Sequence, residues 1–356
     1  MVGFAMTYFR PNIERMHGYV PGEQPKIPGL IKLNTNENPY PPSPKVLAAL
    51  REAIGDSLRL YPDPNWTALR QKIGQQYGFD PNEVIVANGS DETLSLATRA
   101  FVGEGEKLGY FWPSYSLYPV LGDIQGTQKV EFPLDEHFQI VAHTPLLHQL
   151  QDVKLLFVTN PNAPSGVWIQ RVELQRVIEA MKGVVLIDEA YVDFCQENCL
   201  DFVREYPNVI VARTMSKSYS LAGMRIGYAF GSKELIAGLM KVKDSYNVNR
   251  LSQVAAIAAI EDQAHFRENV RKVIATRERV RQAMIDLGFF VYPSQANYLF
   301  AKPAKGKAAD LYQFLREGRI LVRYFSAPRV NEFIRISIGT DAEMDALLKR
   351  AQEWLK

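Results

Sequence analysis

Cysteine is scarce in this chain, and long apolar stretches are missing from it. The 356 residues include two cysteines, Cys195 and Cys199, four positions apart, so the two could share one face of a helix. No histidine or further cysteine stands near them to complete a zinc set, so we expect two free thiols in a reducing compartment. No run approaches the ~20 apolar residues of a membrane-spanning helix, and the first eight residues lack a signal-peptide pattern. We therefore expect a soluble, cytoplasmic protein.

An excess of charge of one sign is also missing. Lys and Arg number 41 against 39 Asp and Glu, which leaves a formal net charge of +2. This near-balance excludes a dominant electrostatic footprint for nucleic acid. Apolar residues interleave with the basic stretch 267–281, so we expect its cations to form the solvated face of an amphipathic helix. The predicted partners are small molecules, with no nucleic acid, membrane or metal.

Short apolar runs alternate with segments of helical spacing. Residues 84–87, 155–158, 184–187 and 209–212 are rich in β-branched side chains, which is typical of buried strands in a parallel sheet. Residues 92–101, 114–121 and 171–181 each place apolar side chains on one helical stripe. Strands that alternate with helices predict an α/β domain.

The pattern changes near residue 245. Long helices are expected over 251–287, strands over 289–292, 297–301, 320–322 and 333–338, and a closing helix from 342. The first forty residues are rich in proline and predict an arm rather than an element. Because single cores stop growing at roughly 250–300 residues, we divide the chain into an N-terminal arm (1–39), a large domain (40–245) and a small α+β C-terminal domain (246–356).

Lys217 stands in a hydroxyl-rich turn that follows a predicted strand. A lysine there could form a Schiff base, which requires a neutral amine and hence a pKa below the ordinary value of about 10.4. Burial or a neighbouring cation such as Arg225 would lower that pKa. The hydroxyls of Thr214 and Ser216 with the Arg225 guanidinium would also suit a phosphate monoester. The alternative is a surface loop with a solvated lysine.

Two further segments carry polar groups at strand ends. Asp188 ends a buried strand, where it could hold a pyridinium nitrogen protonated, and Tyr191 could bond a phenolate oxygen. The alternative is that Asp188 and Glu189 cap the next helix. Residues 88–93 join a strand to a helix through small residues, which favours an anion cradle of backbone amides over an ordinary helix cap.

These segments form part of an ordered set of motifs: residues 17–22, 33–39, 61–63, 89–92, 160–166, 188–191, 216–225, 246–249 and 335–339. The set resembles the fold-type I pyridoxal-phosphate-dependent aminotransferases, and most closely the histidinol-phosphate aminotransferases of histidine biosynthesis. The resemblance covers nearly the whole chain. It implies a mostly parallel seven-stranded sheet between helices, with a smaller α+β domain. The implied reaction is transamination between L-histidinol phosphate and 2-oxoglutarate, which gives imidazole acetol phosphate and glutamate.

The resemblance also implies the roles of individual residues. Lys217 would bind pyridoxal 5'-phosphate covalently, Asp188 would pair with its ring nitrogen and Tyr191 with its ring oxygen. The remaining cofactor contacts would come from the backbone of the phosphate cradle and from side chains around the ring: Ser90, Asp91, Glu92, Tyr115, Asn162, Thr214, Ser216, Arg225 and Tyr61. Tyr61 would reach the cofactor of the neighbouring subunit, which implies an obligate homodimer with composite sites. The substrate would be bound by Tyr19, Asn36, Arg323 and Arg335.

One position departs from the family pattern. The family usually reads Asn-Asn-Pro-Thr-Gly where this chain has Ala163 in place of the second asparagine. Asn162 or Asn160 could take over the ring-oxygen contact, Tyr191 could make it alone, or the electronics of the cofactor could differ. Three other functions stay open: an aromatic amino-acid aminotransferase, a phosphothreonine decarboxylase, and a non-enzymatic sensor that binds pyridoxal phosphate.

Overall fold

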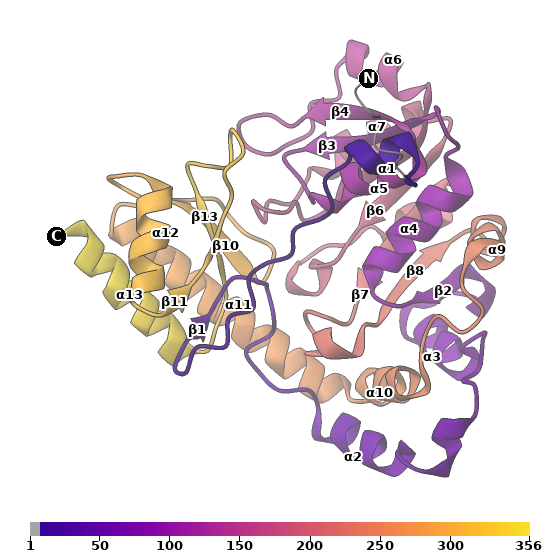
Figure 1. Ribbon diagram of the computed structural model, residues 1–356, viewed down its shortest axis with the longest axis horizontal. Helices are drawn as coiled ribbons and strands as arrows, with labels where there is room; N and C mark the ends of the chain where they lie inside the picture. The colour runs from indigo at the N-terminus through magenta and orange to yellow at the C-terminus, as the bar shows by residue number, and fades with distance from the viewer. Residues whose placement is uncertain (1–7) are drawn as a thin grey trace, which may run out of the picture.

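A seven-stranded sheet forms the larger part of the structure, a computed structural model that describes residues 8–356 (Figure 1). Its strand order is β2-β8-β7-β6-β5-β3-β4, and the neighbours from β7 to β4 are parallel. The strands are β2 (Val84–Ala87), β3 (Lys107–Trp112), β4 (Gln128–Pro133), β5 (Val153–Thr159), β6 (Val184–Asp188), β7 (Val209–Thr214) and β8 (Gly227–Gly231). The predicted α/β fold with a mostly parallel seven-stranded sheet is confirmed.

The four apolar runs all form strands, but the pairing of one differs from the prediction. Strand β2 pairs with β8 alone, and β8 is antiparallel to both β2 and β7. The sequence did not predict β8, because Gly227–Gly231 begins and ends with glycine. Gly227 is required there, since a Cβ would collide with the backbone of Gly89 and Ser90. The reversed strand therefore fits against the start of the helix after β2.

Helices cover this sheet and its edges. They are α2 (Pro44–Ala53), α3 (Thr67–Tyr77), α4 (Ser90–Phe101), α5 (Leu117–Gln125), α6 (Thr144–Leu150), α7 (Arg171–Ala180), α8 (Leu200–Glu205), α9 (Lys233–Val242) and α10 (Arg250–Glu261), with short 3-10 turns η1 (Asp56–Arg59), η2 (Pro81–Glu83), η3 (Val192–Phe194) and η4 (Ala222–Met224). The helix expected over 114–121 begins later, at Leu117, and ends where Gly126 takes a left-handed conformation with φ 78°.

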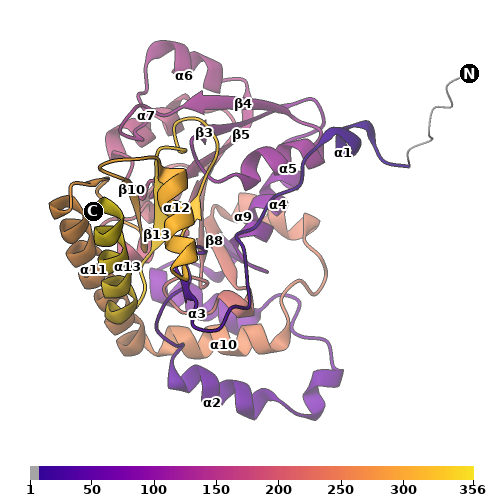
Figure 2. The same cartoon turned by 60° about the vertical axis from the view of Figure 1, so that its left-hand side comes forward.

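A smaller antiparallel sheet of order β12-β13-β10-β9 lies beside the larger part, with the long helices of the C-terminal half against it (Figures 1 and 2). These elements are α11 (Gln263–Asp286), β9 (Phe290–Val291), β10 (Tyr298–Lys302), α12 (Ala308–Glu317), β12 (Arg323–Tyr324), β13 (Ile334–Ser337) and α13 (Asp341–Leu355). The strand predicted over 320–322 does not join this sheet. It forms β11 (Ile320–Leu321), which pairs in parallel with β1 (Ile31–Lys32).

The N-terminal segment contains two short elements that its proline content had argued against. Helix α1 (Pro11–Arg15) lies beside α5 (Figure 2), where Asn12 donates to the carbonyl of Asp123 at 2.7 Å. Strand β1 lies farther along, against the smaller part of the molecule. The segment therefore contacts both parts, through side chains at α1 and through backbone pairing at β1, and local composition does not reveal these contacts.

Two apolar clusters form the core, one around the large sheet and one between the small sheet and its helices. We keep the division of the chain after residues 39 and 245 as a proposal. Helix α10, which follows the second boundary, buries Ala255 and Ala256 in the first cluster. No helix among residues 8–356 is long and apolar enough to cross a membrane.

Two details of the sequence interpretation are wrong. Arg277 was expected on the solvated face of α11, but it is buried and donates to the carbonyls of Phe194 and Ala296. Cys195 and Cys199 share no helix, because Cys195 follows η3 and Cys199 precedes α8. Both thiols are free, as predicted.

Candidate active site

Lys217 lies three residues beyond the carboxyl end of β7 and is partly buried. Its Nζ donates to the carbonyl of Thr35 at 3.3 Å and lies 5.9 Å from the ring centroid of Tyr191. Burial lowers the pKa of this amine to about 8, and the nearby Arg335 cation is the next largest cause. Arg225, which the sequence suggested for this effect, contributes less. The amine is therefore poised to lose its proton close to neutral pH.

Asp188 is the last residue of β6 and is buried. Its Oδ2 accepts from the Tyr118 hydroxyl at 3.0 Å, and its Oδ1 accepts from the Ala190 amide at 3.1 Å. Burial raises the pKa of the carboxyl to about 7 against the effect of the Tyr118 bond. The carboxylate caps no helix, since η3 begins after Tyr191 without a side-chain cap. A cationic ligand group beside Asp188 would restore its charge.

The start of α4 provides an anion cradle. Gly89 precedes the helix with φ 81° and no side-chain cap, so the first amides of α4 have no side-chain acceptor there. The Arg225 guanidinium lies against Gly89, where a Cβ would collide with it. Arg225 Nη1 donates to the Ser216 hydroxyl at 3.4 Å, and the Ser216 and Thr214 hydroxyls are 2.9 Å apart. These amides, hydroxyls and guanidinium match the donors that a phosphate monoester requires.

Asp91 and Tyr115 line the same end of the site. The Tyr115 hydroxyl donates to Asp91 Oδ1 at 3.2 Å, and Arg225 Nη2 pairs with Asp91 Oδ2 at 3.4 Å. The Tyr19 ring meets the Tyr115 ring edge-on at 5.7 Å between centroids. Tyr19 therefore links the N-terminal arm to Tyr115, one of the cofactor contacts that the resemblance implies.

Other predicted cofactor contacts have their polar atoms engaged by the protein itself. Glu92 accepts from the Asn88 amide and from Asn247 Nδ2. Asn162 donates to the Pro113 carbonyl at 3.0 Å and accepts from the Ser165 hydroxyl at 2.6 Å. Asn160 accepts from the Ile169 amide at 2.9 Å and contacts the Cys199 thiol. The side chains of Glu92, Asn160 and Asn162 thus hold loops together around the site.

Tyr191 carries the remaining polar group on the predicted ring-oxygen side. Its hydroxyl accepts from Asn36 Nδ2 at 3.0 Å, and its ring lies edge-on to Tyr298 at 5.0 Å. Ala163 packs in a small apolar cluster with Ala296 and Tyr298, against the Tyr191 ring. Asn36, predicted as a substrate ligand, therefore contacts a predicted cofactor ligand.

Arg323 and Arg335 come from the paired strands β12 and β13 of the small sheet. Arg335 Nη2 donates to the Asn34 carbonyl at 2.9 Å, and Arg323 Nη2 lies 3.5 Å from the Val20 carbonyl. The buried Nε of Arg335 has no hydrogen-bond partner in the described part of the chain, residues 8–356. Neither arginine is ion-paired with a carboxylate of residues 8–356. Burial and the Arg335 cation lower the pKa of Arg323, so the pair can accept an anion from outside the chain.

Tyr61 does not take part in this group. It is 76% exposed and stacks on Tyr246 at 4.3 Å between centroids. Exposed apolar side chains accompany it on the same stretch of chain: Leu47, Ile54, Leu58 and Leu60. Such a surface is typical of a site of protein association.

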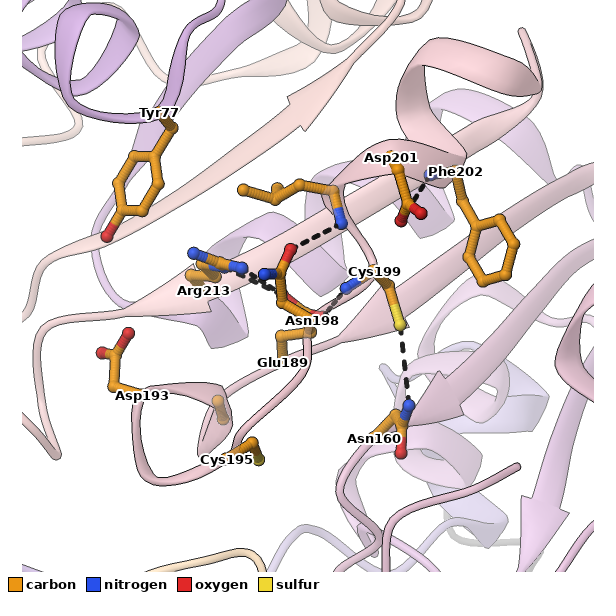
Figure 3. A network of polar contacts seen from close by, with 12 residues as sticks. Tyr77, Asn160, Glu189, Asp193, Cys195, Asn198, Cys199, Asp201, Phe202 and Arg213 are labelled. Carbon is orange, nitrogen blue, oxygen red and sulfur yellow. Dashed lines mark hydrogen bonds and ion pairs between the residues drawn. The ribbon is translucent and has the colours of Figure 1, made fainter. Parts of the chain in front are cut away.

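A buried ion pair behind the site had escaped the sequence analysis (Figure 3). Glu189 Oε2 accepts from Arg213 Nε at 2.8 Å and Nη2 at 2.7 Å, and Glu189 Oε1 accepts from the Cys199 amide. Asp193 accepts from the Ser218 hydroxyl and interacts electrostatically with Arg213. Since Ser218 follows Lys217 and Glu189 follows Asp188, this network joins the two chemically important loops. The only local signals were an arginine inside an apolar strand and an acidic pair at a strand end.

No cluster of His, Cys, Asp or Glu within residues 8–356 has the arrangement of a metal site. The family model for class I and II aminotransferases matches residues 28–350. The chain therefore belongs to the class I and II aminotransferases.

Within that class, the most informative relatives share one name. Histidinol-phosphate aminotransferase of Geobacter sp. (strain M21) is 46% identical over 349 residues, which cover 98% of this chain and 99% of the relative. Its counterpart in Acinetobacter baumannii (strain SDF) is 44% identical over 355 residues, 98% of this chain and 97% of its own. The chain is thus a member of the histidinol-phosphate aminotransferases.

Solved structures support the same fold. The crystal structure of histidinol-phosphate aminotransferase from Sinorhizobium meliloti in complex with pyridoxal-5'-phosphate matches with a TM-score of 0.87 and 27% identity, over 99% of this chain and 98% of that one. L-threonine-O-3-phosphate decarboxylase from Porphyromonas gingivalis matches with a TM-score of 0.79 and 24% identity, over 92% and 99% of the two chains. The second likeness concerns the fold alone.

Proposed function

We propose that this chain catalyses the pyridoxal-phosphate-dependent transamination between L-histidinol phosphate and 2-oxoglutarate in histidine biosynthesis. The observation that carries the proposal is the electrostatic coupling of Lys217 to Arg335, the charge that most lowers the pKa of the amine. An amine donor with an anionic tail can therefore meet the reactive nitrogen and an arginine in one site. The full-length similarity to histidinol-phosphate aminotransferases supports this choice of donor.

The residues present fit the cofactor. Lys217 can bind the aldehyde carbon, Asp188 the ring nitrogen and Tyr191 the ring oxygen. The anion cradle can bind the cofactor phosphate through the backbone amides of Ser90 and Asp91 and through three side chains: Thr214, Ser216 and Arg225. When bound, pyridoxal phosphate supplies an electron sink for the donor's carbon centre. Asp188 becomes ionised beside a protonated ring nitrogen, because its pKa of about 7 in the chain alone reflects burial without a cation.

Lys217 is the proposed acid and base. With a donor amine bound in place of Lys217, Nζ can accept a proton from the donor carbon and return it to the aldehyde carbon of the cofactor. A pKa of about 8 suits both directions near neutral pH. The Thr35 carbonyl, 3.3 Å from Nζ, orients the amine. Glu92 and Asn162 hold the surrounding loops, as their contacts indicate.

Arg323 and Arg335 are the proposed anion site for both half-reactions. Histidinol phosphate offers a phosphate and the oxo acid offers a carboxylate, and a guanidinium binds either. Tyr19 and Asn36 would complete this end of the pocket. Because both residues belong to the N-terminal arm, the arm would line the substrate pocket between the two parts of the chain.

A test of the function follows the half-reaction. Protein loaded with pyridoxal phosphate is mixed with L-histidinol phosphate in the absence of an oxo acid, and the absorbance spectrum is recorded. Growth of the pyridoxamine-phosphate band, together with imidazole acetol phosphate as product, is the expected result. Lys217→Ala serves as the control without a reactive amine. Release of CO2 from phosphothreonine, or faster conversion of phenylalanine, would replace the proposed donor by one of the other family functions.

We also propose an obligate homodimer in which Tyr61 of each subunit reaches the partner's cofactor phosphate. The exposed Tyr61 and Tyr246 stack supports this, since it lies apart from the site of its own chain. Mixing inactive Lys217→Ala with inactive Tyr61→Ala subunits should restore part of the activity, because a mixed dimer contains one intact composite site. If sizing analysis shows that subunits exchange between dimers and mixing still restores no activity, the composite site is excluded. The cytoplasmic location stays a proposal, for cell fractionation to test.

A further inference from the structure

The ring-oxygen side of the site has a single candidate donor. Ala163 offers no polar side chain, and the side-chain nitrogens of the neighbouring asparagines already donate, Asn162 Nδ2 to the Pro113 carbonyl and Asn160 Nδ2 to the Cys199 sulfur. Tyr191 is then the one side chain of this group that is left to donate, and a hydroxyl has one proton. What decides its function is the direction in which that proton points.

Asn36 and Ser337 determine that direction. The Ser337 hydroxyl accepts from the backbone N–H of Asn36 at 2.9 Å and donates to Asn36 Oδ1 at 2.9 Å. It has no other acceptor within residues 8–356. The side-chain amide must therefore turn its oxygen to Ser337 and its nitrogen to Tyr191, where Nδ2 donates at 3.0 Å. Because Nδ2 occupies a lone pair of the Tyr191 hydroxyl, the hydroxyl proton is free for another acceptor.

The three polar groups sit in a rigid setting. Asn36 is 1% exposed and Ser337 is 3% exposed, so water does not compete for their bonds. Asn36 adopts a left-handed backbone with φ 57°, which asparagine tolerates better than most residues. Its carbonyl accepts from Asn297 Nδ2 at 2.9 Å. Ser337 ends β13, so a strand of the small sheet fixes its hydroxyl beside Asn36.

We propose that Ser337 and Asn36 are positioning residues that orient the Tyr191 proton toward the cofactor ring oxygen, in place of the asparagine contact absent at Ala163. This inference rests on the proposed function. Negative charge on the ring oxygen holds the proton on the Lys217 nitrogen of the loaded protein. A donor to that oxygen neutralises part of this charge, so it lowers the pH at which the proton leaves. The relay Ser337, Asn36, Tyr191 therefore sets the pH at which the Lys217 nitrogen releases its proton.

The test is a spectrophotometric pH titration of the loaded protein, which reads that proton without turnover. Asn36→Gly removes the relay while glycine accepts the left-handed backbone. Ser337→Ala frees the side-chain amide to turn its oxygen to Tyr191 and draw the proton away from the ring. Each should raise the midpoint by about one pH unit. Thr276→Val is the matched control. Thr276 lies in α11 and is buried, and its hydroxyl donates to the Asp341 side chain at 2.9 Å.

A restoring variant sharpens the test. Ala163→Asn adds a direct donor, so it should lower the midpoint, and in combination with Asn36→Gly it should return the midpoint toward that of the unaltered protein. Midpoints of Asn36→Gly and Ser337→Ala equal to that of the unaltered protein would overturn the relay. An equal rise of the midpoint in Thr276→Val would indicate a general structural effect and would also overturn the relay. If the unaltered protein forms no absorbing bond between Lys217 and the cofactor, the proposed function itself fails.

Discussion

Arg323 lies directly opposite Arg335 on the neighbouring antiparallel strands β12 and β13. Residues paired in this way project from the same face of the sheet. Two like charges at such a position repel each other: burial lowers the pKa of Arg323, and the Arg335 cation lowers it further. An anion bound between the two guanidinium groups relieves that repulsion, which makes the pair specific for anionic substrates.

Replacing either arginine should therefore weaken binding of the phosphorylated donor. Arg335→Ala and Arg323→Ala should each raise KM for L-histidinol phosphate by about 10- to 100-fold, the value of a charged hydrogen bond of about 1.5–3 kcal/mol. KM for unphosphorylated histidinol should change much less. Steady-state kinetics with both donors measures the difference. Arg279→Ala, which removes an exposed arginine paired with Asp341 and Asp345, is the control. Equal effects on both donors would contradict the anion site.

The amine of Lys217 should titrate near pH 8. Its pKa in the folded chain is about 8 instead of the ordinary 10.5, so the neutral amine accumulates as pH rises through 8. The rate at which the cofactor-free protein binds pyridoxal phosphate covalently should rise with the same midpoint, measured by stopped-flow absorbance. Arg335→Ala removes a cation that disfavours the ammonium form, so it should move the midpoint to higher pH. A midpoint above 10 in the unaltered protein would refute the assignment.

Asp188 should cost stability in the cofactor-free protein at neutral pH. Its folded pKa of about 7 exceeds the ordinary 3.8. The stability that the protonated carboxyl contributes is therefore full below about pH 4 and is lost as pH rises through 7. Asp188→Asn removes this titration, so it should be more stable than the unaltered protein by about 2–4 kcal/mol at pH 8 and by little at pH 4.

Urea unfolding of both cofactor-free proteins across this pH range measures the effect. The same variant should lose transamination, because an amide carries no charge to hold the ring nitrogen protonated. A parallel pH dependence of the two proteins would show that the carboxyl titrates elsewhere.

The buried pair of Glu189 and Arg213 should respond unequally to removal of its two partners. Arg213→Met leaves the buried Glu189 carboxylate and the half-buried Asp193 carboxylate without a cation, so it should lower the free energy of unfolding by about 3–5 kcal/mol. Glu189→Gln leaves Arg213 near Asp193 and should lower it by about half as much. The double variant should be less destabilised than the sum of the two. Denaturant titration measures the free energy of unfolding of each variant. Equal losses of this free energy in the two single variants would contradict the role of Asp193.

Local patterns predicted much of the fold and the chemical residues. The four apolar runs became strands because β-branched residues in short runs favour burial in a sheet, wherever the strand finally pairs. Lys217 and Asp188 were recognisable because each follows a strand, and strand ends in an α/β sheet meet at one edge. Strand β8 was missed, since its terminal glycines carry no β signal, and its reversed direction depends on its neighbours.

The contacts between distant residues were not predictable. The Tyr118 hydroxyl, which bonds both Asp188 and the Thr159 hydroxyl, belongs to a helix whose local pattern reports only apolar spacing. Ser337 and Asn36 are 301 positions apart, and neither carries a motif that names the other.

The sequence by itself determined the family, the layered α/β architecture, and the lysine and carboxylate on which the chemistry depends. The family follows from the resemblance of the ordered motifs, and the other features follow from periodicity and from neighbours along the chain. Only the tertiary structure decided which cation lowers the pKa of Lys217, which side chains support Tyr191 and how Arg213 is neutralised. The physical reason is that charge interactions and hydrogen bonds act over a few ångströms, and packing alone brings those groups within that range.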